Sequence, residues 1–284
     1  MSIKLFSHRP ELPELELRHG NARLRLSMQG AHITQYVIDD NDLLWVSKSA
    51  KFAKGSAIRG GIPLCWPWFG ASLDNPDWPQ HGFARTGTFR LVSQATDDHG
   101  ASVVLELDTS SAVPAWRHAA HLEVEIRLSD HLWMELRTSN TSDQSVMVGA
   151  GLHSYFSVAS SRDVKIPALT GRAYLDKPRG YVRQLQRDPL IVEGEIDRVY
   201  VDAPQGVALE DPGNGRRIMI DAWGNTDLVV WNPGSSVATA MADFDDDGYE
   251  RMVCIEPAIA LDRRFRLDPG DTLALGQTIR MDTL

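Results

Sequence analysis

The sequence predicts an all-β fold, a large antiparallel β-sandwich. Three observations support this prediction: apolar and polar residues alternate with period two in many short segments, turn residues separate these segments evenly, and long helical periodicity is missing. No linker or internal repeat divides the chain. We therefore expect residues 1–284 to form a single domain.

Length and composition agree with such a fold. All-β sandwiches commonly reach the 284 residues of this chain as one unit. Apolar residues make up 43% and charged residues 24%, which is ordinary for a globular protein. The chain can therefore bury a sizeable core.

The clearest strands form a predicted hairpin. Apolar residues at every second position of 122–128 alternate with charged ones, and the pattern resumes over 132–136 after the turn Ser129–His131. Further expected strands are 22–28, 33–38, 103–107, 146–151, 217–222, 228–231, 252–255 and 272–280. Residues 48–85 are rich in Gly, Pro and Trp with little alternation, so we expect long loops there, lying over the sheet.

The charge balance excludes some partners. The formal net charge is −9 and basic residues form no block, so nucleic acid is not an expected partner. Residues 1–16 hold no apolar run typical of a signal peptide, and no stretch reaches the length of a membrane span. We expect a cytoplasmic protein that does not bind membranes.

No metal site is expected from the sequence. Cys65 and Cys254 form no metal-binding motif and are predicted to be buried small hydrophobes. Asp243, Asp245 and Asp247 match the start of a calcium-binding EF-hand loop, but Cys254 stands where that loop needs a glutamate. We interpret the acidic run as a solvated loop.

Three strings place titratable residues among apolar or glycine neighbours: Gln80–Arg85, which contains His81; Gly149–Phe156, which contains His153; and Val253–Ala258, which contains Glu256. Arg85 offers a donor fork for phosphate or carboxylate, and His153 can exchange a proton near neutral pH. Each string has a structural alternative: a surface arginine, buried histidines with satisfied hydrogen bonds, and a buried salt bridge for Glu256.

Other residues are weaker candidates. Asp197 could bind a sugar hydroxyl or orient a histidine, although an Asp-Arg pair is commonly a surface ion pair. Arg59, flanked by glycines, could be a second anion contact or a solvated side chain. The aromatic string of residues 66–69, with Trp78, fits either stacking on a sugar ring or the core.

Taken together, these strings resemble the hexose-6-phosphate mutarotases, or glucose-6-phosphate 1-epimerases, of the galactose-mutarotase-like superfamily. The matching strings, in the family's order, are 59–63 (RGGIP), 80–85 (QHGFAR), 152–156 (LHSYF), 197–200 (DRVY), 230–233 (VWNP) and 254–257 (CIEP). The resemblance implies a supersandwich with an open cleft, independent of metals and of any cofactor.

The resemblance also implies roles for these residues. His153 takes the general-acid role and Glu256 the general-base role, so that the anomers interconvert by ring opening and reclosure. His81 and Asp197 contact sugar hydroxyls or the ring oxygen. Gln80, Arg59 and Arg85 resemble the phosphate and substrate contacts of the family. The expected partner is a small hexose 6-phosphate, and the expected assembly is a monomer.

Two other functions compete with this interpretation. A mutarotase of unphosphorylated aldoses would use the same acid and base, but the two arginines favour a phosphorylated sugar. A non-catalytic carbohydrate-binding or sensor protein could share the sandwich, although we would expect it to lack the acid or the base. A glycosidase would use two carboxylates, whereas the candidate pair is a histidine and a glutamate.

Overall fold

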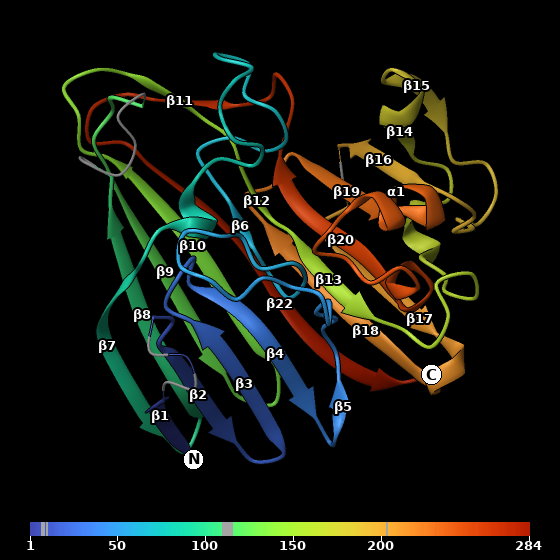
Figure 1. Cartoon of the computed structure of the whole chain (residues 1–284), viewed down its shortest axis with the longest axis horizontal. Coiled ribbons are helices and arrows are strands. Elements are labelled where there is room, and N and C mark those ends of the chain that lie inside the picture. The colour runs from blue at the N-terminus through green and yellow to red at the C-terminus, as the bar shows by residue number, and fades with distance from the viewer. Residues whose placement is uncertain (7–8, 10, 110–115, 203) are drawn as a thin grey trace.

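The computed structural model describes residues 1–6, 9, 11–109, 116–202 and 204–284, and it confirms the all-β prediction (Figure 1). In these ranges the strands form four sheets, and the strand ladders are antiparallel. The only α-helix assigned there is α1 (Gly234–Ala240), which the sequence analysis did not predict. Short 3-10 helices are η1 (Ala84–Thr86), η2 (Pro167–Leu169), η3 (Lys177–Arg179), η4 (Pro212–Asn214) and η5 (Gly248–Arg251).

The first sheet contains the N-terminal strands in chain order. They are β1 (Ser2–Phe6), β2 (Glu14–His19), β3 (Ala22–Ser27), β4 (His32–Ile38) and β5 (Asn41–Asp42). In Figure 1 this sheet, coloured blue, lies over strands β7 to β9 of the second sheet, and β2 and β3 contact β8 and β9. Leucines of β2 and β3 fill the space between the two layers.

The second sheet contains the predicted hairpin. Its order is β17 (Gly206–Asp211), β18 (Arg216–Trp223), β22 (Thr272–Thr283), β10 (Leu132–Asn140), β9 (Ala120–Leu128), β8 (Gly100–Asp108) and β7 (Arg90–Asp97). Leu128 pairs with Leu132 across the turn, as the alternation predicted. The apolar residues of β9 are completely buried, so this face of the sheet forms core.

The fourth sheet carries the candidate site. It contains β15 (Val182–Leu185), β14 (Ala173–Asp176), β16 (Ile196–Val201), β19 (Asp227–Asn232), β20 (Met252–Ile259), β12 (Ala150–Leu152) and β6 (Leu64–Cys65), in that order. Strand β13 (Ser154–Ser157) also pairs with β20. On one face, the buried hydroxyl of Ser154 lies 3.2 Å from Oε1 of Gln277 in β22, which links this sheet to the second one.

Two of the expected segments differ in detail from the predictions. The expected strand 146–151 is divided at Gly149, because β11 (Val146–Val148) pairs with β21 (Phe265–Leu267) in a separate two-stranded sheet, whereas β12 joins the fourth sheet. Residues 48–85 are mainly loop, as expected, but they also contribute β6 and part of η1. Within the described ranges, no helix combines the length and apolar character needed to cross a membrane.

Candidate active site

The register of the fourth sheet brings His153 and Glu256 together. Gly151 of β12 pairs with Ala258 of β20, and Ser154 of β13 pairs with Ile255. The same register sets His153, between β12 and β13, opposite Glu256. Nδ1 of His153 lies 3.3 Å from Oε2 of Glu256, and only 8% and 1% of the two side chains are exposed. An imidazole and a carboxyl group therefore face each other in a nearly water-free environment.

Neighbouring strands add residues to the same face of the sheet. Asp197 of β16 pairs with Trp231 of β19, which pairs in turn with Cys254 of β20. The ring of Trp231 meets that of His153 edge-on, with centroids 5.8 Å apart. Tyr155 stacks nearly parallel on His153, with centroids 4.7 Å apart, and it also meets the ring of Trp231 edge-on. These aromatic contacts restrict the orientation of the imidazole.

His81 reaches the site from the loop over the sheet. Its ring centroid lies 5.3 Å from that of His153. The backbone N–H of Gly70 donates to Nδ1 of His81 at 3.3 Å, and the Sγ of Cys65 lies 3.2 Å from the same nitrogen. Nδ1 therefore acts as an acceptor, and the neutral imidazole carries its proton on Nε2. Burial, reinforced by the nearby cations, lowers the pKa of His81 well below its usual value, so the ring is a neutral donor.

A strained turn holds His81 in this position. His81 has φ = 63° and Gly82 has φ = 68°. Both values lie in the left-handed region, which residues other than glycine rarely adopt. A Cβ at Gly82 would stand 1.9 Å from the carbonyl oxygen of Trp66. The glycine is thus required by the close approach of the two backbone segments.

The two predicted arginines have different surroundings. Arg59 donates to the Tyr155 hydroxyl at 3.2 Å and forms an ion pair with Asp243 at 3.3 Å. Arg85 donates to the backbone carbonyl of Gln80 at 2.6 Å and forms no ion pair with a described carboxylate. Its charge remains available for an anionic ligand.

Lys177, which the sequence analysis did not single out, adds a third cation. It lies in η3, directly after β14, and its Nζ is 2.5 Å from Oδ2 of Asp197. The alternative interpretation, a surface ion pair between Asp197 and Arg198, is not observed; Arg198 donates to Gln186 instead. Asp197 is 8% exposed and belongs to the site.

Burial dominates the electrostatics of the facing pair. Loss of hydration raises the pKa of Glu256 well above its usual value; Asp197 adds to this shift, while Lys177 opposes it. Loss of hydration also lowers the pKa of His153, with further contributions from His81, Arg59 and Arg85. Burial therefore favours the state in which both groups are neutral, with one proton shared between the Glu256 carboxyl group and Nδ1 of His153.

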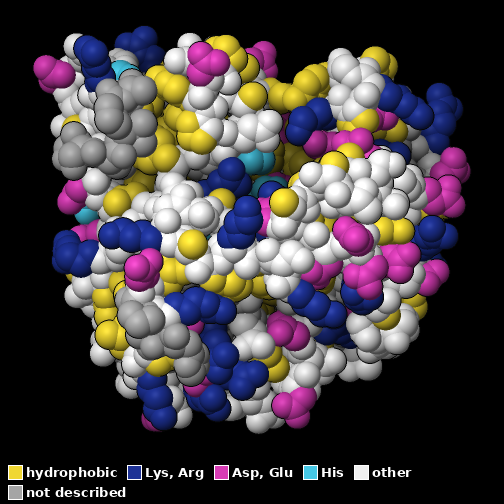
Figure 2. Space-filling model, in the orientation of Figure 1, with side chains coloured by type: hydrophobic (Ala, Val, Ile, Leu, Met, Phe, Trp, Pro, Cys, Tyr) yellow, Lys and Arg dark blue, Asp and Glu magenta, His cyan; other side chains and the backbone are white. Residues whose placement is uncertain are grey.

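All seven predicted site residues line one cavity of about 490 Å³. Figure 2 shows a hollow in the molecular surface where histidine side chains lie beneath a rim with Lys and Arg side chains. The lining consists of Arg59, Phe69, Gln80, His81, Arg85, His153, Lys177, Pro178, Glu195, Asp197, Val229, Trp231, Val237, Met241 and Glu256. This volume lies within the usual range for small-molecule sites.

Comparison with known proteins agrees with this geometry. The sequence profile of the family described as aldose 1-epimerase matches residues 13–280. The chain belongs to the aldose 1-epimerase family. It is therefore an isomerase of carbohydrate metabolism, with the activity of an aldose epimerase or mutarotase.

Similar proteins support the assignment to this family. This aldose 1-epimerase is 31% identical over 258 residues to a Salmonella typhimurium protein named "Putative glucose-6-phosphate 1-epimerase", with 89% of this chain and 86% of that protein aligned. An Escherichia coli K12 protein of the same name is 30% identical, with 96% and 92% aligned. The crystal structure of a "putative mutarotase" from Salmonella typhimurium superimposes with a TM-score of 0.92 at 28% identity, covering 99% and 94% of the chains.

The structure of this epimerase shows where the aromatic string and the two cysteines lie. Trp66 and Trp68 are core residues, and Trp78 stacks on Trp68. From that aromatic string only Phe69 lines the cavity, whereas Trp231, to which no role was assigned, lines it as well. The prediction that both cysteines are buried is confirmed.

The acidic run is solvated only in part: Asp246 and Asp247 are exposed as expected, whereas Asp243 and Asp245 are partly buried. Asp243 binds Arg59, Asp245 accepts hydrogen bonds from the backbone of Lys48 and Ser49, and Asp247 pairs with Arg251. The three carboxylates therefore have three different partners. Asp243 and Asp245 help to fix the loop that carries Arg59.

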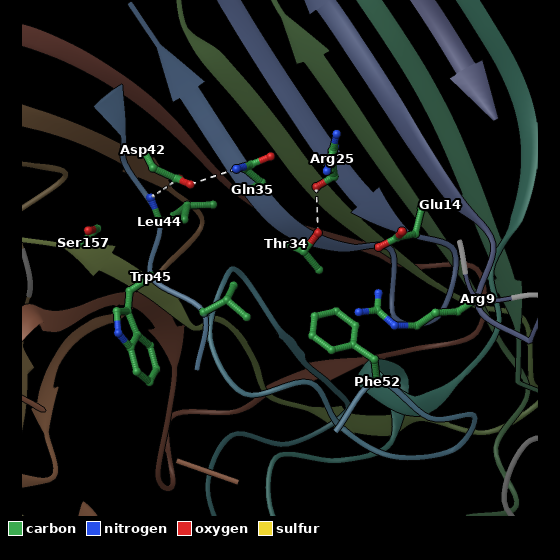
Figure 3. Close-up of a pocket in the computed structure, with 11 residues that line it drawn as sticks. Arg9, Glu14, Arg25, Thr34, Gln35, Asp42, Leu44, Trp45, Phe52 and Ser157 are labelled. Atoms are coloured by element: carbon green, nitrogen blue, oxygen red, sulfur yellow. Dashed lines mark hydrogen bonds between the residues drawn. The ribbon is translucent and has the colours of Figure 1, made fainter. Parts of the chain in front are cut away.

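A second hollow, of about 570 Å³, lies beside β3, β4 and β5 (Figure 3). Gln35 donates to Asp42 at 3.0 Å, and the guanidinium of Arg9 lies 4.1 Å from the ring centroid of Phe52. Its described lining contains no histidine or cysteine. Although this hollow is larger, it lacks an acid–base pair like that of the cleft.

Proposed function

We propose that this epimerase interconverts the α and β anomers of a hexose 6-phosphate, with His153 and Glu256 as its acid–base pair. The observation that carries the proposal is the 3.3 Å approach of these two groups at the bottom of a cleft that also holds Arg59, Arg85 and Lys177. Opening a pyranose requires a proton to leave the C1 hydroxyl while another reaches the ring oxygen. A carboxylate and an imidazolium provide both functions.

The pair can reach its active state without exchanging protons with solvent. A shift of one proton from Glu256 to Nδ1 of His153 converts the neutral pair into carboxylate and imidazolium, and leaves Nε2–H free to serve the sugar. Glu256 then takes the C1 hydroxyl proton while Nε2–H protonates the ring oxygen. After rotation about the C1–C2 bond, the roles reverse during reclosure and the net proton count is unchanged.

The other cleft residues bind the substrate in this proposal. Neutral His81 donates from Nε2, and Asp197 accepts from a sugar hydroxyl. Arg85 binds the phosphate with charge-assisted hydrogen bonds, because no described carboxylate neutralises it. Arg59 and Gln80 complete the contacts to substrate. In the free-aldose alternative the substrate has no anionic group for Arg85 to bind, although Arg85 has no ion-pair partner among the described residues.

We also propose that one copy of the chain, folded as one domain, is sufficient for activity. Every residue given a role comes from the same chain, and they line one cavity. Size-exclusion chromatography with light scattering, run at assay concentrations, tests whether the active species is a monomer.

Saturation-transfer NMR on glucose 6-phosphate tests the reaction. We expect the wild type to accelerate anomer exchange, and Glu256→Gln or His153→Ala to reduce the rate by about 10²- to 10⁴-fold while remaining folded. The exposed residues Glu193 and His99 provide matched controls, as Glu193→Gln and His99→Ala. Faster exchange of galactose than of any hexose phosphate would favour the free-aldose alternative. Sugar binding without exchange would identify a binding protein.

A further inference from the structure

Cys254 lies beside the acid–base pair and has no role in the proposed reaction. It stands two residues before Glu256 on β20, so both side chains lie on the same face of the sheet. The Sγ of Cys254, one nitrogen of His153 and one carboxyl oxygen of Glu256 all lie within 4.8 Å of one another, and all three residues are buried. Thiolate, imidazole and carboxylate are the three types of side chain that bind Zn²⁺.

Two of the polar atoms in this cluster have no hydrogen-bond partner. Nδ1 of His153 and Oε2 of Glu256 are inaccessible to solvent, and neither makes a hydrogen bond to the described part of the chain. Their separation of 3.3 Å is slightly longer than a normal hydrogen bond. Unsatisfied buried polar atoms are costly, so their convergence indicates a place for a ligand between them.

The spacing fits a tetrahedral cation. Bond lengths of about 2.0–2.1 Å to nitrogen and oxygen place two ligands of a tetrahedral zinc roughly 3.4 Å apart, and a sulfur ligand roughly 3.6 Å from each of them. The observed 3.3 Å between nitrogen and oxygen is close to that edge. The sulfur lies within 4.8 Å of a nitrogen of His153 and an oxygen of Glu256, so it needs to move by at most about 1 Å to reach that distance.

We propose that His153, Cys254 and Glu256 bind a thiophilic divalent cation such as Zn²⁺, and that this cation inhibits the enzyme. The ion enters from the cleft, which His153 and Glu256 line, and its fourth position faces that cavity. Binding converts the Cys254 thiol to a thiolate and releases its proton to solvent. The predicted inhibition rests on the proposed function: the cation binds Nδ1 of His153 and Oε2 of Glu256, which must exchange a proton during the reaction.

The charges around the site allow a cation to bind. Asp243 pairs with Arg59, and Asp197 pairs with Lys177, so the cations of these two pairs are largely neutralised. The remaining charged side chains in the cavity lining, apart from Glu256, are Arg85 and Glu195, which have opposite signs.

Another cluster of potential ligands does not share these properties. Glu106, His121 and Glu123 come close together on β8 and β9, but they are partly exposed. Each has an ion-pair partner: Arg90 for Glu106, Asp108 for His121 and Arg137 for Glu123. With no unpaired buried atom, this cluster does not indicate a bound cation.

Cobalt absorption spectroscopy tests the site independently of activity. Co²⁺ is added to the metal-free enzyme, and a thiolate-to-cobalt charge-transfer band reports a bound sulfur ligand. Displacement by Zn²⁺ gives the zinc affinity. We expect one equivalent to bind to the wild type. Cys254→Ala removes the band and weakens zinc binding by at least about tenfold, since even supporting residues of metal sites contribute that much. The other buried cysteine provides the control, and Cys65→Ala keeps the band.

The activity measurement is separate. Zn²⁺ slows anomer exchange by the wild type, EDTA restores the rate, and Cys254→Ala needs at least about tenfold more zinc for the same inhibition. A wild type without a band at millimolar cobalt overturns the proposal, as does a band that persists in Cys254→Ala or disappears in Cys65→Ala. If Cys254→Ala does not fold, Glu256→Gln replaces it: it retains the thiol, and unchanged zinc affinity there also overturns the proposal. The cobalt result remains valid even if hexose phosphates are not the substrate.

Discussion

Lys177 and Asp197 form a short ion pair at the edge of the cleft, with Nζ 2.5 Å from Oδ2. Burial raises the pKa of Asp197, while Lys177 opposes that increase. Lys177 also lowers the pKa of Glu256, against the larger effect of burial. One lysine therefore favours the ionised forms of two carboxyl groups in the site, and we assign it a positioning role.

Replacing this lysine tests that role. Lys177→Met should raise KM for the hexose phosphate by about two- to fivefold, the effect expected for an ion pair whose lysine is 45% exposed. The loss of positive charge raises the pKa of Asp197 and of Glu256. Steady-state kinetics measure KM and kcat separately, and Lys177→Arg should restore KM. The exposed Lys165 provides the control, as Lys165→Met. Equal KM values in the wild type and Lys177→Met would exclude this role.

The contrast between Arg85 and Arg59 predicts different effects of removing them. Arg85→Ala should raise KM for glucose 6-phosphate by roughly 10- to 150-fold, the equivalent of one charged hydrogen-bonding group, and leave KM for free glucose nearly unchanged. Arg59→Ala should also lower the melting temperature, because it leaves Asp243 and the Tyr155 hydroxyl without their partner. Kinetics on both sugars and thermal melting distinguish the two arginines. A similar loss on both sugars in Arg85→Ala would contradict phosphate binding.

The pH dependence of kcat/KM reports the proton held by the catalytic pair. Because the pKa of His153 is lowered, the second proton binds only below pH 6.5, and activity should fall on the acid side below that value. Because the pKa of Glu256 is raised above 4.5, the pair loses its remaining proton at a higher pH than an ordinary carboxyl group, which gives the alkaline limb. These two apparent pKa values belong to the pair.

The substrate itself complicates this measurement. Its phosphate ionises near pH 6, at about the position of an expected limb. The profile should therefore be repeated with glucose 6-sulfate, whose ester stays a monoanion. A sulfate profile with an acid limb above pH 6.5 would contradict the lowered pKa of His153.

Sequence alternation predicted some of the regular strands of the sandwich, but it missed others, such as β17, which also alternates between buried and more exposed positions. β9 and β10 alternate between buried and partly exposed positions, and both were predicted. β15 was missed because three of its four residues are exposed and the fourth is only partly buried, so no apolar period exists. α1 was missed because it is only seven residues long. Its start is fixed by Asn232, whose side-chain oxygen accepts from the N–H of Gly234.

For the candidate site too, the sequence indicated individual residues but not their contacts in the folded chain. His153 and Glu256 could be selected because each interrupts an apolar string, but the sequence did not show that the register sets them opposite each other. Lys177 begins the short charged segment η3, which looks ordinary in the sequence, and only the β14–β16 pairing reveals its contact with Asp197. Cys254 was correctly predicted to be buried. Its proximity to the acid–base pair is a property of the folded sheet.

Glu256 should make the folded protein less stable at high pH. Its pKa is raised by burial, so the folded chain keeps a proton that the unfolded chain loses above pH 4.5. Stability therefore falls as the pH rises from 4.5 to the folded-state pKa, and above that pH the native site contains a buried carboxylate. Glu256→Gln removes this penalty, so at pH 8 its melting temperature should exceed that of the wild type by at least about 2 °C.

The difference should decrease as the pH falls toward 4.5 and below, where the carboxyl group becomes protonated in the unfolded chain as well. Thermal melting from pH 4.5 to pH 8 measures this trend, and the exposed Glu193→Gln serves as the control because it should show no such trend. Because His153 contacts Glu256, the difference at each pH reports the titration of the coupled pair. If the difference at pH 8 equals that at pH 4.5, the substitution acts through packing, and the carboxylate is not the destabilising group.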